Sequence, residues 1–213
     1  MTHLSLPEEF VLLLHKPRGS YYATADHTGA AELGELVLTE RFALTDKKLT
    51  VLDPASTGTA WIDESVEFVQ RKAGPKGRPL AATTFIQSRR KARERHAEAL
   101  VERGLMRRER RKALFIPYDH FTPDPGTRDA LAARIRAAAR NEVQLDERLA
   151  MLAALVQATG LQTHLGLDKA ERKRLKEISK GEELGGAVRD VIAQTTAVLT
   201  AVTVAGAAAA SGS

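Results

Sequence analysis

Apolar residues recur every three or four positions along most of this chain, and this helical period is the strongest constraint on its fold. Near the start, Phe10, Leu13 and Leu14 define one apolar face. The same period predicts helices over residues 30–38, 56–72, 84–103, 127–140, 146–159 and 168–179, and from 187 onward. Aromatic residues make up only 5% of the chain while Ala and Leu abound, which also favours helices.

Two stretches depart from the helical period. Phe42 and Leu44, and then Leu49 and Val51, alternate with polar residues around 46–48, which predicts a small hairpin. The later stretch LMRRERRKALFIP similarly predicts two short strands around a charged turn. Both stretches are short, so they add hairpins to a helical protein and do not change its class.

These patterns predict a mainly α protein, a single helical domain with one or two small β-hairpins. We expect this domain over residues 1–205 and a flexible tail over 206–213. The chain of 213 residues is long enough to bury a core. It contains no Cys, which excludes disulfides and thiolate catalysis. Residues 1–10 lack the basic and apolar regions of a secretory signal, so we expect a cytoplasmic protein.

An uncharged run at 191–210 qualifies the expectation of a water-soluble fold. Its twenty residues are just enough to cross a bilayer. Ala and Thr dominate the run, however, so its hydrophobic drive is weak. A buried terminal helix is the preferred interpretation, and association with a membrane is the alternative.

Catalytic and metal-binding patterns do not emerge from the sequence. The six His residues are scattered, and no pair has the spacing of metal ligands on a helix. Asp119 and His120 are the nearest approach to a catalytic pair, but adjacent residues in a turn are usually surface groups. We therefore expect a non-enzymatic protein without a metal or another cofactor.

The basic residues are concentrated in one segment. Residues 85–115 hold eleven Arg or Lys and four Glu, a formal charge of 11 − 4 = +7, in a chain whose total is +5. The remaining residues together are therefore mildly acidic. This segregation of charge indicates a surface that meets an anionic partner.

The first half of this segment offers a pair of arginines. On the expected helix at 84–103, Arg90 and Arg93 lie three residues apart, about one turn, on a shared face. Two guanidinium groups at that separation can grip one phosphate or two neighbouring phosphates. The alternative is a solvated face, since Glu94 and Glu98 stand where they can pair with nearby arginines.

The second half carries a denser basic cluster, which we expect at the hairpin turn. Its members are Arg107, Arg108, Arg110, Arg111 and Lys112. Apolar residues follow directly, among them Phe115, Ile116 and Tyr118. An apolar tip beside cations suits the surface of an anionic membrane, as a site of attraction and insertion. The alternative is that these apolar residues form the core-facing side of a strand.

Two further hypotheses compete with membrane binding. A helix followed by Gly-Leu and a basic hairpin also outlines a winged helix, in which the hairpin contacts nucleic-acid phosphates. Few side chains in the segment suit the reading of base edges, which makes nucleic acid the less favoured partner. The third hypothesis is a scaffold that forms homo-oligomers through the hairpin.

Five motifs follow one another along most of the chain. They are VLLLHKPRG, LGELVLTERFALTD, STGTAWIDESV, RRKARERHAEALVERGLM and DERLAMLAALVQATGL. Together they resemble the Golgi phosphoprotein 3 family, which includes bacterial members. The fourth motif is similar to the family pattern Arg-x-x-Arg-Glu-Arg-Leu followed by Leu-Val-Glu-x-Gly-Val-Leu.

The resemblance implies a mostly helical adaptor that binds the cytoplasmic face of a membrane peripherally. Eukaryotic members recognise phosphatidylinositol 4-phosphate and help to retain glycosyltransferases in the Golgi. Anionic lipids and membrane-protein clients are therefore the implied partners. The family hairpin, which contributes to membrane contact or self-association, falls on residues 105–118.

The family's headgroup pocket carries over only in part. Two of its arginines fall on Arg90 and Arg93. A third falls near Gly29, and the family Trp falls in a shortened region around Tyr21 and Tyr22. Half of the pocket is altered, so the resemblance leaves the headgroup open.

Overall fold

The computed structural model describes residues 3–22, 27–180, 190 and 192–198. Its helices are α1 (Leu6–Leu14), α2 (Thr28–Leu38), α3 (Ala60–Ala73), α4 (Ala82–Ser88), α5 (Ala92–Glu102), α6 (Pro125–Ala139), α7 (Glu147–Ala158), the 3-10 helix η1 (Leu161–His164) and α8 (Lys169–Ile178). Its strands are β1 (Phe42–Thr45), β2 (Lys48–Val51), β3 (Leu80–Ala81), β4 (Met106–Ala113) and β5 (Ile116–Pro123). The prediction of a mainly α fold with small hairpins is confirmed.

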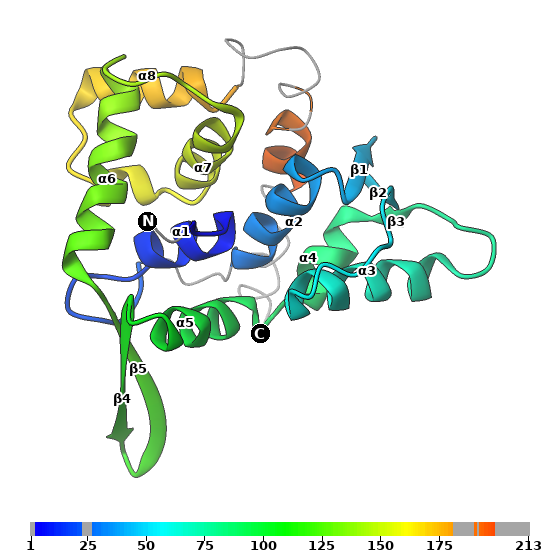
Figure 1. The fold of residues 1–213 in the computed structure, drawn as a ribbon. Coiled ribbons are helices and arrows are strands. Elements are labelled where there is room, and N and C mark those ends of the chain that lie inside the picture. The colour runs from blue at the N-terminus through cyan, green and yellow to red at the C-terminus, as the bar shows by residue number, and fades with distance from the viewer. Residues whose placement is uncertain (1–2, 23–26, 181–189, 191, 199–213) are drawn as a thin grey trace, which may run out of the picture.

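Helix α1 forms the centre of the core. Every one of its residues is buried, and it contacts α2, α5, α6 and α7, which surround it in Figure 1. A helix that is buried on all sides needs apolar residues around its whole circumference. The run Phe10–Leu14 supplies them, since each of its side chains is fully buried.

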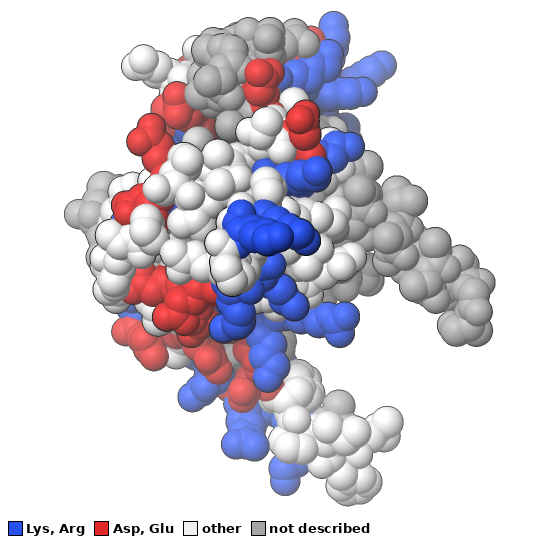
Figure 2. Space-filling model, turned by 90° about the vertical axis from the view of Figure 1, so that its right-hand side faces the viewer, with Lys and Arg blue, Asp and Glu red and all other residues white. Residues whose placement is uncertain are grey.

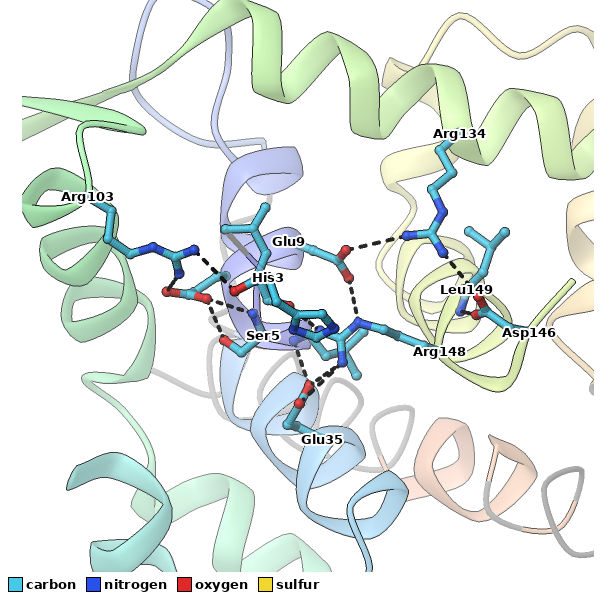
Figure 3. A network of polar contacts seen from close by, with 12 residues as sticks. His3, Ser5, Glu9, Glu35, Arg103, Arg134, Asp146, Arg148 and Leu149 are labelled. Atoms are coloured by element: carbon cyan, nitrogen blue, oxygen red, sulfur yellow. Dashed lines mark hydrogen bonds and ion pairs between the residues drawn. The ribbon is translucent and has the colours of Figure 1, made fainter. Parts of the chain in front are cut away.

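Two carboxylates on α1 are also buried, and arginines from neighbouring helices neutralise them. Arg148 of α7 lies between Glu9 of α1, at 3.3 Å, and Glu35 of α2, at 2.9 Å. Arg103, which ends α5, pairs with Glu8, and its guanidinium also donates to the His3 carbonyl at 3.2 Å (Figure 3). Buried charges are stable only when paired, so this network fixes how four helices meet.

The strands form two separate antiparallel sheets. The first has the order β1-β2-β3, and its β1–β2 register pairs Phe42 with Val51 and Leu44 with Leu49. The hairpin predicted at 42–51 is therefore confirmed, with β3 as an added third strand. The second sheet is the β4–β5 hairpin, which projects from the helices beyond the end of α5 (Figure 1).

The single basic helix predicted over 84–103 is wrong, because the chain breaks between α4 and α5. The break falls at residues 89–91. There Arg89 turns into the protein, and its Nε donates to the buried carboxylate of Glu32 at 2.5 Å. The side chain also passes close to α2, since a Cβ on Gly29 would lie 2.9 Å from Arg89 Cβ. Tertiary contacts at this point override the helical period.

Two predictions concern the C-terminal part of the chain. The expected tail at 206–213 lies outside the described residues, as does most of the uncharged run at 191–210. Residues 192–198 are helical, and Ile192 and Val198 are fully buried. Within the described ranges, no helix combines the length and apolarity needed to cross a membrane.

Candidate functional site: a basic hairpin and the cavity at its base

The turn of the β4–β5 hairpin is apolar, not charged. Leu114 and Phe115 form a two-residue loop between the paired residues Ala113 and Ile116. Both loop residues have positive φ, 47° and 73°, as in the tight turn that matches the strand twist. Their exposed fractions are 92% and 94%, and Ile116 is 69% exposed. The prediction that the basic cluster occupies the turn is wrong, since those residues lie along β4.

The five cations of β4 are divided between the two faces of the hairpin. Because side chains alternate along a strand, three share one face and two share the other. The first face carries Arg108, Arg110 and Lys112, and the second carries Arg107 and Arg111. Figure 2 shows blue side chains along the hairpin, at the bottom of the view, and uncharged atoms at its tip. Basic charge therefore flanks the tip on both sides.

Some of the basic segment serves the fold. Arg89 and His96 both contact Glu32, with His96 Nε2 2.9 Å from Glu32 Oε1, and Glu32 is fully buried. Burial alone would raise the pKa of Glu32, but hydrogen bonds from His96 and Arg89 hold it below its ordinary value. Arg95 pairs with Glu64 at the surface, at 3.1 Å.

Arg90 and Arg93 behave differently from these neighbours. Among the described residues, neither has a carboxylate within ion-pair distance. Arg90 is exposed in the turn between α4 and α5, and Arg93 is half-buried in the first turn of α5. Their spacing predicted that the two arginines share one helix, but only Arg93 lies in a helix. Neither charge is neutralised by an ion pair.

The side chain of Arg93 lines a cavity of about 570 Å³ at the base of the hairpin. The walls come from the loop after α1, from the start of α5 and from β5. They comprise His15, Ser20, Tyr21, Arg93, Glu94, Ala97, Pro117, Tyr118, Asp119, His120 and Phe121. The Arg93 guanidinium lies 3.8 Å from the centre of the Tyr21 ring, a cation–π contact that holds the charge in place.

The hairpin is fixed to the loop after α1, which gives the cavity its shape. His120 Nε2 lies 3.1 Å from the Arg18 carbonyl oxygen. Gly19 has φ +83°, and a Cβ there would lie 2.0 Å from His120 Nε2. Only glycine fits this close approach. His120 is therefore an anchor of the hairpin: both it and Asp119 line the cavity, but its Nε2 contacts the Arg18 carbonyl and not the Asp119 carboxylate.

The sequence pattern found part of this site. It singled out Arg93 and Tyr118, which line the cavity, and Arg90, which does not. It missed Ser20 and Glu94, because nothing in the local pattern brings a loop after α1 against β5. The glycine in HKPRGSYY, close to two tyrosines, was the one local feature of the sequence that indicated a close contact at this loop.

Metal binding has no support in the described part of the chain. No group of three or more His, Asp or Glu residues there could hold a metal ion. The cavity instead combines one guanidinium group, from Arg93, with the carboxylates of Glu94 and Asp119. The combination is that of a helical protein with a projecting basic hairpin and a small polar cavity at its root.

This fold class agrees with the family comparison. The model of the Golgi phosphoprotein 3 family matches residues 6–195, so the chain belongs to that family. The match spans α1 to α8 and both hairpins. No curated protein matches the chain.

Proposed function

We propose that this protein is a peripheral membrane protein that binds anionic phospholipid on the cytoplasmic face of a membrane. The observation that carries the proposal is the hairpin tip, where Leu114 and Phe115 are almost wholly exposed. Large apolar side chains placed at a projecting turn gain free energy by leaving water. They do so most readily where cations beside them meet anionic headgroups.

The expected magnitudes are adequate for reversible attachment. Full burial of one Leu or Phe contributes about 1.5–3 kcal/mol. Each basic residue close to an anionic surface adds about 1 kcal/mol. Because the cations of β4 point to both sides of the hairpin, they remain near the surface when the tip enters the membrane interface.

In this proposal the cavity at the base of the hairpin receives one headgroup. The unpaired Arg93 provides a charge-assisted hydrogen-bond donor for a phosphate, and the exposed Arg90 adds to the local potential. By family resemblance, phosphatidylinositol 4-phosphate or a similar phosphoinositide is the reference headgroup. In this proposal the protein acts as a non-enzymatic adaptor that holds membrane-protein clients.

Vesicle co-sedimentation tests the proposal. Wild type is compared with Leu114→Asn/Phe115→Gly and with Arg90→Glu/Arg93→Glu on phosphatidylcholine vesicles with and without anionic lipid. We expect wild type to bind only the anionic vesicles and both variants to bind at least about tenfold more weakly. Absence of binding at low salt overturns the proposal, and duplex DNA binding with a steep salt slope would support the winged-helix alternative.

Self-association is the second candidate function, and the same tip favours it. Two exposed apolar tips can cover each other in a homo-oligomer. Sedimentation of the wild type and the Leu114→Asn/Phe115→Gly variant distinguishes the two uses of the tip. A concentration-dependent dimer that disappears in the variant, without membranes present, would support the oligomeric scaffold.

A further inference from the structure

The cavity at the base of the hairpin contains charges of both signs. Its one permanent cation is Arg93, while Glu94 and Asp119 each contribute a carboxylate. Counting Arg, Asp and Glu side chains alone, the formal charge of the lining is 1 − 2 = −1. A cavity built for a polyanion alone would carry an excess of cations. This cavity suits a ligand that carries positive charge as well as negative charge.

Neither carboxylate is used by the fold. Within the described part of the chain, the side chains of Glu94 and Asp119 have no ion pair or hydrogen bond, and both are exposed. Asp119 lies opposite Arg110 across the hairpin, yet the two form no ion pair. Glu94 directly follows Arg93 and does not pair with it. Three charged side chains therefore line one cavity without an ion pair among them, Arg93 resting on the Tyr21 ring and both carboxylates reaching solvent.

We propose that this cavity binds a phosphate ester that also carries a primary ammonium group, with ethanolamine phosphate as the parent structure. Arg93 donates to the phosphate oxygens, and Glu94 and Asp119 accept hydrogen bonds from the ammonium group. This inference rests on the proposed membrane function and assigns the cavity a zwitterionic headgroup in place of the reference phosphoinositide. The same chemistry also occurs in the free, water-soluble phosphate ester.

The aromatic side chains distinguish a primary ammonium group from a quaternary one. A quaternary ammonium has no N–H donor and depends on the faces of aromatic rings. Tyr21, Tyr118 and Phe121 line the cavity, and the Tyr21 ring is already engaged by the Arg93 guanidinium at 3.8 Å, so the two carboxylates decide in favour of a primary ammonium. A primary ammonium has three donors and matches two carboxylates. The volume of about 570 Å³ is within the range of small-ligand sites and leaves room for glycerol next to the headgroup.

Calorimetric titration of the full chain with soluble probes tests the ligand class. The probes are O-phosphoethanolamine, inorganic phosphate, phosphocholine and inositol 1,4-bisphosphate. We expect O-phosphoethanolamine to bind about tenfold or more tightly than each of the others. Glu94→Gln/Asp119→Asn should remove that preference but keep phosphate binding, and Arg93→Met should remove both. Glu102→Gln, an exposed carboxylate on the same helix outside the cavity, is the matched control and should change nothing.

Vesicles then separate the two sources of the ligand. At a constant content of phosphatidylglycerol, phosphatidylethanolamine is exchanged for phosphatidylcholine. Binding that rises several-fold with phosphatidylethanolamine in wild type, but not in Glu94→Gln/Asp119→Asn, identifies a lipid headgroup. A preference for O-phosphoethanolamine in solution without this rise identifies the free phosphate ester as the ligand. The proposed ligand class then stands, and the lipid headgroup is excluded as its source.

Failure of the inference is distinguishable from failure of the membrane function. If wild type binds anionic vesicles but binds O-phosphoethanolamine no better than inorganic phosphate, the headgroup inference is overturned and the membrane proposal stands. Tighter binding of inositol 1,4-bisphosphate would also overturn it. If no vesicle and no soluble probe binds, both are overturned.

Discussion

The helical body and the β4–β5 hairpin differ in which residue types they bury and which they expose. Around Glu32, two cationic or polar partners lie inside the protein, and the carboxylate between them has no exposed surface. At the hairpin, large apolar residues are in water and cations stand along a strand with few partners. The body therefore buries paired charged groups, while the hairpin exposes large apolar side chains to solvent.

The difference separates stability from function. Buried charges in the body are paired, so removing one partner should damage the fold. Exposed apolar groups in the hairpin add nothing to the core, so removing them should leave the fold intact. Substitutions in the two regions should consequently affect different measurements, and each prediction below tests that separation.

The largest effect is expected at Glu32. Glu32→Gln removes the negative charge that neutralises Arg89, whose side chain is only 8% exposed. An uncompensated buried charge costs about 3–5 kcal/mol. Urea denaturation should show that loss in the free energy of unfolding. A change below about 1 kcal/mol would mean that solvent reaches Arg89, and would contradict the buried-pair interpretation.

The same carboxylate should make the wild type sensitive to acid. Because folding lowers the pKa of Glu32 from 4.5, its contribution to stability is fully present above pH 4.5. The contribution is lost as the pH falls below 4.5 through the folded-state pKa. The free energy of unfolding, measured from pH 7 down to acid pH, should therefore fall less steeply in Glu32→Gln than in wild type. Each protein's value at pH 7 serves as its reference.

The next largest effect is expected at the hairpin tip, and there the two measurements should move in opposite directions. Leu114→Asn/Phe115→Gly places an Asn-Gly pair in a turn whose residues have positive φ. Left-handed backbone costs a bulky residue about 1–2 kcal/mol, so the free energy of unfolding should rise or stay constant. Vesicle affinity should fall by about tenfold or more. Parallel loss of stability and vesicle binding would show that the tip belongs to the core.

A smaller effect per substituted residue is expected for the cations of β4 than for the apolar residues of the tip. Arg110→Gln/Lys112→Gln removes two charges from one face, and Arg107→Gln with Arg110→Gln removes one from each face. Each lost charge should weaken vesicle binding by about 1 kcal/mol, or fivefold. Equal effects of the two variants indicate that the hairpin enters the membrane edge-on, whereas a larger effect of the first indicates that one face lies on the membrane. Affinity should be measured at two salt concentrations, since attraction weakens as salt rises.

The smallest effect is expected at a surface pair in the body. Arg95 and Glu64 lie 3.1 Å apart with side chains 38% and 54% exposed. Glu64→Gln should change the free energy of unfolding by less than about 1 kcal/mol and should leave vesicle binding unchanged. This variant is the matched control for Glu32→Gln, because both remove a carboxylate partner of an arginine in the basic segment. A loss as large as that of Glu32→Gln would remove the distinction between buried and exposed pairs.

Much of the fold was predictable because it depends on local periodicity. The spacing of apolar residues predicted the helices near α2, α6, α7 and α8 to within a few residues, and alternation predicted β1 and β2. The break after Ser88 was not predictable in this way. It exists because Arg89 reaches Glu32, a residue 57 positions earlier in the chain. No window of local sequence contains both partners.

The candidate site was predictable only in outline. Charge counting located the basic segment, and family resemblance singled out Arg90 and Arg93. The apolar turn was misplaced because the pattern LMRRERRKALF does not say where the chain reverses; the register of β4 with β5 places the reversal at Leu114 and Phe115. The same register brings Asp119 beside the loop after α1.

The sequence by itself determined a mainly α protein of the Golgi phosphoprotein 3 family with a basic, aromatic-flanked hairpin, because period, charge and motif order are local properties. Only the tertiary structure decided which charges are available. It buried Arg89 against Glu32 and left Arg93 over the Tyr21 ring. Ion pairing depends on residues far apart in the chain, so two arginines four positions apart came to lie in different environments.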